Sequence, residues 1–240
     1  MVLYLPVAFL FFVVARPFVL KEFRGLRNGL LYSGLSETRA IPDTSNLAEY
    51  ASGRAGGKIV LSLTTPTILP QASLIRRLLR GSSRPGSPWA ALGEDMRLES
   101  CWLLGGKSGQ LGVGLSRAVR ISHVVVDHHV GNNLTAPRQM ILWGLVDGEE
   151  NLASLRALRA KRTDVIPVAH AFPAISGGLS FVPLSSFKYD THATNLTQTF
   201  PIFPFVVDSG MGFKVIVLEI LDNWGGTSTC LYHFRVYGGY

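Results

Sequence analysis

Residues 213–238 read FKVIVLEILDNWGGTSTCLYHFRVYG. One apolar run lies before, and one after, a segment that contains asparagine and two glycines. β-Branched and aromatic side chains favour strands, whereas Asn, Asp and Gly favour the turns between them. The same alternation extends back towards Cys101, where the other runs are residues 101–104, 110–115, 118–127, 138–146, 184–189 and 196–202. Short strands at such regular spacing predict an all-β fold, a compact β-sandwich.

Two segments predict helices instead. Residues 149–162, EENLASLRALRAKR, place three leucines on one side and end on basic residues, which is typical of a surface helix inserted between strands. Residues 46–52, NLAEYAS, predict a short helix. The run KIVLSL at residues 58–63 then predicts a strand.

Composition and motifs exclude several functions. Of the 240 residues, 47% are hydrophobic and 16% charged, which excludes a disordered chain and fits one large domain or two small ones. The 23 Lys and Arg residues against 16 Asp and Glu residues give a net charge of +7, but they form no stripe, so nucleic acid is not predicted as a partner.

The patterns of common enzymes are missing as well. His123, Asp127 and His129 would share one face of an extended strand, but this face would spread them over about 20 Å, too far for one metal ion. The chain lacks a GxSxG motif, and GGKSGQ at residues 105–110 lacks the first glycine of a phosphate-binding loop. We therefore predict no catalytic residues.

The first twenty residues carry one charged side chain, Arg16, and residues 1–15 form an uninterrupted apolar run. As a helix this run would extend roughly 22 Å, short of a hydrocarbon core of about 30 Å. Residues 1–20 are therefore a membrane anchor, part of a longer anchor, a signal peptide or a buried strand. Residues 21–45, which contain Gly, Ser and Arg without periodicity, predict a linker.

Two signals disagree about the side of the membrane. Basic residues at positions 16, 21, 24 and 27 follow the apolar run and would leave this flank in the cytosol. Residues 133–135 and 195–197 both read NLT, an N-glycosylation sequon that is used only after translocation into a lumen.

The chain has two cysteines, Cys101 and Cys230, 129 positions apart. They are either two separate buried thiols, the default in the cytosol, or a disulfide pair. A bridge that closes so long a loop would stabilise the fold by about 4 to 5 kcal/mol. Two cysteines without a CxxC motif do not build a zinc site.

Within residues 67–86, the stretch 74–80 has aliphatic side chains at helical spacing among three arginines. They predict either an amphipathic flap of about three helical turns or a hairpin. Three roles remain open for this segment: a small surface helix packed on the core, a mobile lid, and a basic helix on a membrane surface.

Several short motifs together resemble the SUN domain. They are CWLL (101–104), DH (127–128), TAP (135–137), QTF (198–200), NWG (223–225) and TCLYHFRVYG (229–238), with EYA (49–51), GG (56–57) and IV (59–60) resembling the start of the domain. The closing run is the specific part, and the resemblance covers about residues 46–240.

The resemblance implies a compact β-sandwich in the perinuclear space, joined to the inner nuclear membrane through the N-terminal segment. SUN domains form homotrimers there and bind the C-terminal peptides of KASH-domain proteins in the outer membrane. The resulting LINC bridge carries cytoskeletal force to the nucleus. The resemblance therefore implies a tether and not an enzyme.

The resemblance also implies site residues. In the family, the carboxylate at the end of the KASH peptide is held by a His after an acidic residue, a Ser or Thr before Ala-Pro and a Tyr after a cysteine. These roles carry over to His128, Thr135 and Tyr232. Cys101 and Cys230 match the disulfide of the family.

Two loops carry over in the same way. Residues 67–86 match the β-hairpin that clamps the KASH peptide, the KASH lid. Residues 90–101 match a loop that binds a monovalent cation, potassium in the family, largely through backbone carbonyls. The candidate cation positions are Ala90, Gly93, Asp95 and Ser100.

The chain departs from the family at four places. Ser228 replaces a tyrosine that contacts the peptide, and Thr64 replaces a cysteine that in some members bonds covalently to KASH. Residues 156–180 look like an insertion, and no coiled-coil heptads precede Leu47 to support a trimer. The alternative function is a lumenal β-sandwich that binds carbohydrate or assists protein folding, for which exposed aromatic platforms would be the sign.

Overall fold

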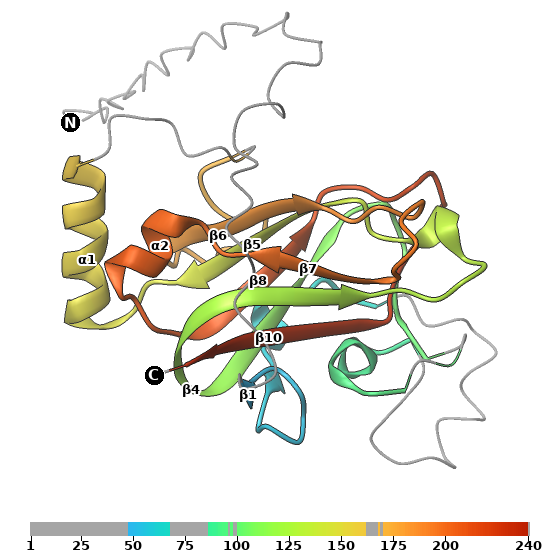
Figure 1. Ribbon diagram of the computed structural model, residues 1–240, viewed down its shortest axis with the longest axis horizontal. Helices are drawn as coiled ribbons and strands as arrows, with labels where there is room; N and C mark the ends of the chain where they lie inside the picture. Colours follow the sequence, from blue (N-terminus) through green and yellow to red (C-terminus); the bar gives the residue numbers. More distant parts are fainter. Residues whose placement is uncertain are drawn as a thin grey trace, which may run out of the picture. The chain divides into compact units, whose positions relative to one another are not determined.

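One long strand, β4 (Gly109–Asp127), belongs to both of the larger sheets of the protein (Figure 1). In the computed structural model, its register with β8 breaks between Gly114 and Val119, and there the strand passes from one sheet into the other. Residues 110–115 and 118–127, predicted as two strands, are thus the two halves of one. The described residues are 48–67, 86–95, 97, 100–161, 168 and 170–239.

Two antiparallel sheets share β4. The first has the order β1-β10-β4-β7 and the second the order β2-β4-β8-β5-β6. A separate two-stranded sheet pairs β3 with β9. The other strands are β1 (Ala48–Glu49), β2 (Lys58–Ile59), β3 (Trp102–Leu104), β5 (Gln139–Leu145), β6 (Phe181–Lys188), β7 (Thr197–Pro201), β8 (Phe213–Ile220), β9 (Thr229–Leu231) and β10 (His233–Gly239).

The core lies between the two sheets. Val124 and Val126 of β4 point into it, and so do Phe234 and Val236 of the neighbouring β10. Apolar residues of β5 and β8 enter the same buried cluster from the other sheet. Because successive side chains of a strand face opposite sides, His123, Val125 and Asp127 at the end of β4 lie on the outer face of the first sheet. The predicted all-β sandwich is confirmed.

The predicted surface helix is α1 (Gly148–Lys161). Leu155 is buried, and Leu152 and Leu158 pack against the core from the same side, as the leucine spacing predicted. A shorter helix, α2 (Pro204–Ser209), lies beside α1 at one end of the strands (Figure 1).

The short helix predicted at residues 46–52 is wrong. Ala48 and Glu49 form β1, where Ala48 pairs with Gly238 of β10. The Glu49 carboxylate then turns back and accepts the backbone N–H groups of Ala51 and Ser52, at 2.6 and 2.9 Å. The open edge of β10 outweighs a weak local helix preference. Of the strand predicted at 58–63, residues 58–59 are extended, and Leu61–Leu63 form a 3-10 turn.

The outer face of the second sheet is covered by part of the predicted insertion, residues 156–180. Its first residues are the end of α1, and residues 170–175 contact two polar side chains of the sheet. Glu219 accepts hydrogen bonds from Trp143 Nε1 and from the backbone N–H of Ala174, at 2.8 and 3.0 Å, and its Oε2 lies 2.8 Å from His170 Nε2.

Gln110 holds the same segment a few residues further along. Its Nε2 donates to the carbonyl of Ile175 at 2.9 Å, and its Oε1 accepts the N–H of Ile175 at 2.8 Å. Beside these anchors, five buried apolar residues form a second, smaller core: Leu63, Ile141, Trp143, Phe181 and Val217. The predicted insertion therefore shields a sheet face that would otherwise meet water.

Replacing Glu219 by alanine is expected to lower the free energy of unfolding by about 1 to 3 kcal/mol, because buried N–H donors lose their acceptor. The measurement is urea unfolding, with hydrogen exchange at residues 170–175 as a local readout. The matched control is Glu94→Ala. Glu94 forms an exposed ion pair with Arg54, so its loss should change stability little. Equal effects of the two variants would contradict the anchoring role.

All described residues fall within one compact unit, residues 38–240. The predicted anchor (1–20) and linker (21–45) lie outside the described residues, as do all but the two ends of the predicted lid (67–86). In the described ranges, no helix is both long and apolar enough to cross a bilayer.

Candidate functional site

A disulfide joins Cys101 to Cys230, with their Cα atoms 5.5 Å apart. Cys230 is the middle residue of β9, and Cys101 directly precedes β3, its pairing partner. The two cysteines form a small buried cluster with Tyr232. The covalent link thus holds β3 against the segment that carries a predicted site residue.

Both ends of the predicted lid are attached to β3. Thr67 Oγ1 accepts a hydrogen bond from Trp102 Nε1 at 3.0 Å. Gly86 donates its N–H to the carbonyl of Cys101 and accepts the N–H of Leu103, at 3.0 and 3.2 Å. The roots of residues 67–86 therefore lie next to the disulfide.

Three predicted site residues come together. The ring of His128, which follows the last residue of β4, meets the ring of Tyr232 edge-on at a centroid distance of 5.1 Å. The carbonyl oxygen of Asn132 lies 3.2 Å from His128 Nε2 and accepts a hydrogen bond from Thr135 Oγ1 at 3.0 Å. We call His128, Thr135 and Tyr232, with Asn132 between them, the His128 cluster.

The hydrogen bonds of His128 fix its tautomer. A carbonyl oxygen only accepts, so Nε2 carries the proton that it donates to Asn132. The other ring nitrogen, Nδ1, is buried and has no hydrogen-bond partner among the described residues. Burial lowers the pKa of His128 below its usual 6.5, and the neighbouring His129 adds to this, although the bond to Asn132 opposes it. The ring is therefore neutral at pH 7, with a free acceptor nitrogen.

Tyr189 also belongs to this region, although no sequence motif points to it. It is fully buried and meets His128 edge-on at 5.9 Å. Its hydroxyl donates to the carbonyl of Leu196 at 2.7 Å, and the same carbonyl accepts the backbone N–H of His128 at 3.3 Å. Burial, with the charges of Asp127 and Asp190, raises the pKa of Tyr189 to about 12. Its hydroxyl is thus a permanent donor.

Asp127 anchors the strand directly before His128. Both of its carboxylate oxygens accept a hydrogen bond from Arg235 Nη2 at 2.8 Å, and Oδ2 lies 3.1 Å from His233 Nδ1. Burial alone would raise the pKa of Asp127, but hydrogen bonds from His233 and Thr197 and the charge of Arg235 outweigh it and lower the pKa. The ion pair between the buried Asp127 and the half-buried Arg235 ties the end of β4 to β10.

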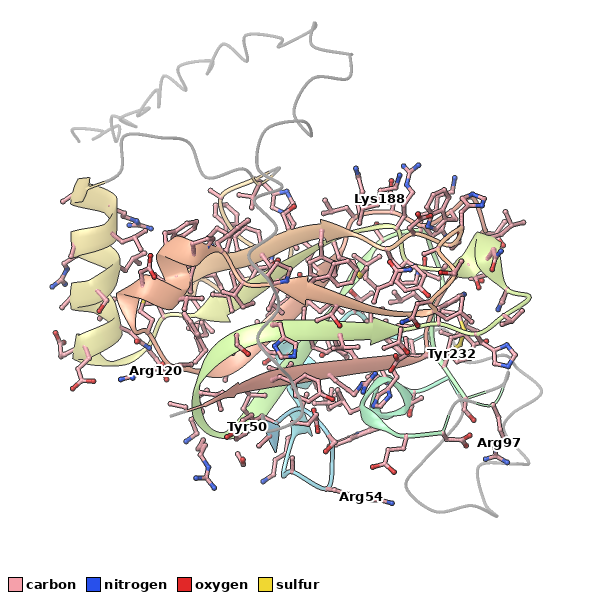
Figure 2. All side chains as sticks on the ribbon, in the orientation of Figure 1. Tyr50, Arg54, Arg97, Arg120, Lys188 and Tyr232 are labelled. Atoms are coloured by element: carbon pink, nitrogen blue, oxygen red, sulfur yellow. A yellow bond between two sulfur atoms is a disulfide. The ribbon has the colours of Figure 1, made fainter. Side chains whose placement is uncertain are left out.

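The cluster lies at one end of the strands. Figure 2 shows Tyr232 and Arg97 towards the end opposite Arg120. His128 and Tyr232 are 3% and 0% exposed, whereas Thr135 is half-buried and Val130 and Leu134 nearby are 69% and 65% exposed. The two rings are therefore closed off from solvent, whereas Thr135, Val130 and Leu134 are accessible to a ligand.

The four predicted cation positions form two separate pairs of contacts, Asp95 with Ser100 and Ala90 with Gly93. The carboxylate of Asp95 accepts hydrogen bonds from Nε and the backbone N–H of Arg97, and one from the Ser100 side chain. Arg97 is the main cause that lowers the pKa of Asp95 far below its usual value. Ala90 accepts the N–H of Gly93 at 3.2 Å. Because a guanidinium already neutralises Asp95, this carboxylate does not fit as a cation ligand, and any cation would depend on backbone carbonyls.

Two departures from the family pattern have structural roles here. Thr64 is buried, and its hydroxyl donates to the carbonyl of Val60 at 2.8 Å and accepts the N–H of Gly112 at 3.0 Å. Ser228, half-buried, uses its carbonyl to accept a hydrogen bond from Asn223 Nδ2 at 2.9 Å. Neither residue can supply the thiol or the phenol that it replaces.

Comparison with known proteins shows which family this chain is similar to. Residues 175–240 match the family model Sad1 / UNC-like C-terminal. SUN domain-containing protein 1 of Homo sapiens is 24% identical over 206 residues, which cover 82% of this chain and 22% of that protein. The resemblance to the SUN-domain family is confirmed. SUN domain-containing protein 2 of Mus musculus is 25% identical over 206 residues, covering 82% of this chain and 24% of that protein.

A SUN domain-containing protein 1 of Dictyostelium discoideum also matches, with 24% identity over 173 residues that cover 65% of this chain and 16% of that protein. The chain thus spans less than a quarter of the length of these SUN-domain relatives.

Solved structures of similar shape include carbohydrate-binding modules. A family 32 module from Streptococcus pneumoniae EndoD has a TM-score of 0.46 and 10% identity, over 80% of this chain and 99% of that chain. A module from Clostridium perfringens in complex with GalNAc-β-1,3-galactose has a TM-score of 0.49 and 11% identity, over 80% and 100%. Both TM-scores lie below 0.5, so neither similarity supports a conclusion about the SUN-like chain.

Proposed function

We propose that this chain is a tether whose SUN domain binds the C-terminal peptide of a KASH protein. The observation that carries the proposal is the convergence of His128, Thr135 and Tyr232 on one spot, with His128 Nδ1 buried and without a partner among the described residues. An unpartnered buried nitrogen is costly, and a ligand that bonds to it recovers that free energy.

The ligand that fits is a carboxylate with apolar residues before it. Once protonated at Nδ1, His128 donates a charge-assisted hydrogen bond to the carboxylate, worth about 1.5 to 3 kcal/mol. The Thr135 hydroxyl can turn from Asn132 to the same anion. The exposed Val130 and Leu134 would contact the apolar residues that precede the terminus. An extended peptide of this kind also gains backbone hydrogen bonds along a strand edge.

The remaining features of the tether are part of the same proposal. The domain would lie in the perinuclear space as a homotrimer, attached to the inner nuclear membrane through residues 1–20. Residues 67–86 would close over the bound peptide from their roots on β3. A potassium ion at residues 90–101 would be held by carbonyls, since Arg97 already occupies Asp95.

The carbohydrate alternative requires exposed aromatic rings side by side. Of the described residues, the large aromatic side chains that are strongly exposed are Trp89 and Phe172. They lie in separate segments, the 3-10 turn Pro88–Leu92 and the loop after α1. We therefore favour the peptide ligand.

The proposal is tested with a synthetic KASH C-terminal peptide and its amidated form, by calorimetry on the full chain. The free carboxylate should bind at least about tenfold more tightly, which corresponds to one lost charge-assisted hydrogen bond. His128→Ala and Thr135→Ala should each remove most of this difference. Lys214→Ala, at an exposed residue near the start of β8 and towards the Arg120 end of the strands, is the control. Equal binding of both peptide forms would refute the carboxylate site.

Peptide binding should also depend on pH. The pKa of free His128 lies below 6.5, and a bound carboxylate raises it, so binding takes up a proton. Affinity should therefore increase as the pH is lowered through the pKa that His128 has in the complex, by up to about tenfold per pH unit. The amidated peptide and the His128→Gln variant should show no such slope. A slope that survives in His128→Gln would assign the proton to another group.

A further inference from the structure

The loop between β6 and β7 contains a sequon that no step of peptide binding uses. Residues 195–197 read Asn-Leu-Thr. The sequon excludes proline at its middle position, and leucine satisfies this condition. Asn195 is exposed. We propose that Asn195 is an N-glycosylation site and carries an N-linked oligosaccharide.

The local geometry suits the reaction. Asn195 Oδ1 accepts the backbone N–H of Thr197 at 2.9 Å, so the loop brings the asparagine amide next to the third residue of the sequon. Nδ2, the atom that would bear the sugar, has no hydrogen-bond partner among the described residues. The folded domain can thus carry a glycan there without breaking an internal bond of the Asn195 side chain.

The loop is also held in a defined shape. Gln198 Nε2 donates to the carbonyls of Asp190 and Asn195, at 2.6 and 3.4 Å, and its Oε1 accepts the N–H of Asp190 at 2.9 Å. Within the sequon, the carbonyl of Leu196 bonds to the N–H of His128, and the Thr197 side chain bonds to Asp127. Asn195 faces solvent, whereas Leu196 and Thr197, the two residues that follow it, bond to His128 and Asp127. A glycan here would therefore stand beside the proposed peptide site.

In the transfer, a lipid-linked oligosaccharyl diphosphate is the donor. A bond forms between Nδ2 of Asn195 and the anomeric carbon of the first sugar. The bond from that carbon to the diphosphate oxygen breaks, and the lipid diphosphate leaves with the electron pair. The amide nitrogen gives up one proton. The donor and its transferase act in the lumen of the endoplasmic reticulum, so this inference rests on the lumenal location in the proposed function.

The test is expression of the full chain in a eukaryotic cell, followed by digestion with a peptide N-glycosidase, which hydrolyses the amide bond between asparagine and the glycan, and by mass spectrometry. We expect the digestion to increase the mobility of the protein and to convert Asn195 to aspartate. Asn195→Gln and Thr197→Ala should each lose one glycan. The matched variant Thr197→Ser keeps the hydroxyl and should keep the glycan. Because the readout is the glycan itself, a loss of stability in Thr197→Ala does not confound it.

Asn133, in the second sequon, is examined separately by Asn133→Gln. A glycan that is lost in Asn133→Gln and kept in Asn195→Gln would overturn the inference while leaving the lumenal location intact. Absence of any glycan on a chain that is protected from protease inside microsomes would overturn the inference alone. Absence of a glycan on a chain that protease digests outside microsomes would overturn the lumenal location as well.

Discussion

Replacing Cys101 and Cys230 together by serine is expected to lower the free energy of unfolding by about 4 to 5 kcal/mol. The bridge closes a loop of 129 residues, and its loss restores the conformational entropy of that loop to the unfolded chain. Thermal unfolding in oxidising buffer measures the effect. A reductant should produce the same loss in the wild type and none in the double variant.

The bridge should matter locally as well. It holds β3 beside β9, and both ends of residues 67–86 attach to β3. Hydrogen exchange at residues 100–104 should therefore increase in the serine variant, and peptide affinity should fall. An unchanged melting temperature in strong reductant, with the thiols shown to be reduced, would contradict the stabilising role.

Replacing Asp127 by asparagine is expected to destabilise the domain by about 3 kcal/mol, because the half-buried Arg235 loses its counterion and His233 and Thr197 lose a charged acceptor. Urea unfolding at pH 7 measures the loss. Removing both partners in Asp127→Asn with Arg235→Met should restore part of it, since the unpaired charge is then gone as well. A double variant as unstable as the sum of the single variants would contradict the coupling.

The pH dependence of Asp127→Asn provides an internal check. The folded-state pKa of Asp127 is depressed, so its contribution is fully present above the unfolded-state value of about 3.9 and is lost as the pH falls through the folded-state pKa. The difference between wild type and Asp127→Asn should therefore be large at pH 7 and should shrink in strong acid. A difference that stays constant down to strong acid would point to packing rather than charge.

The strands were predictable because each has its own local signal. Runs such as FKVIVLEIL and CLYHFRVYG contain β-branched and aromatic residues bounded by Gly or Asn. The first forms β8 at the expected place, whereas the second, predicted as one strand, is divided at Tyr232 into the end of β9 and β10. Pairing is not local, however. Nothing in residues 109–127 shows that one strand serves two sheets, and nothing in residues 46–52 shows that a strand edge is available to them.

The candidate site was predictable only through motifs. His128, Thr135, Tyr232 and the disulfide follow from the resemblance, and the structure brings them together. The carbonyl of Asn132 that joins His128 to Thr135 has no sequence signal, because every residue carries a carbonyl. Tyr189 looks like any aromatic residue at a strand end. Likewise, nothing in the sequence distinguishes Arg97, whose guanidinium binds Asp95, from the other arginines.

The position of His128 directly after β4 bears on how the fold would withstand tension. A pull applied at this residue along the strand acts on hydrogen bonds to β10 and β7 at the same time, on either side. Bonds loaded together in shear share the stress, whereas bonds peeled from one end fail one after another. Further along, the same backbone continues into the second sheet beside β8, so the load would spread across the whole sandwich.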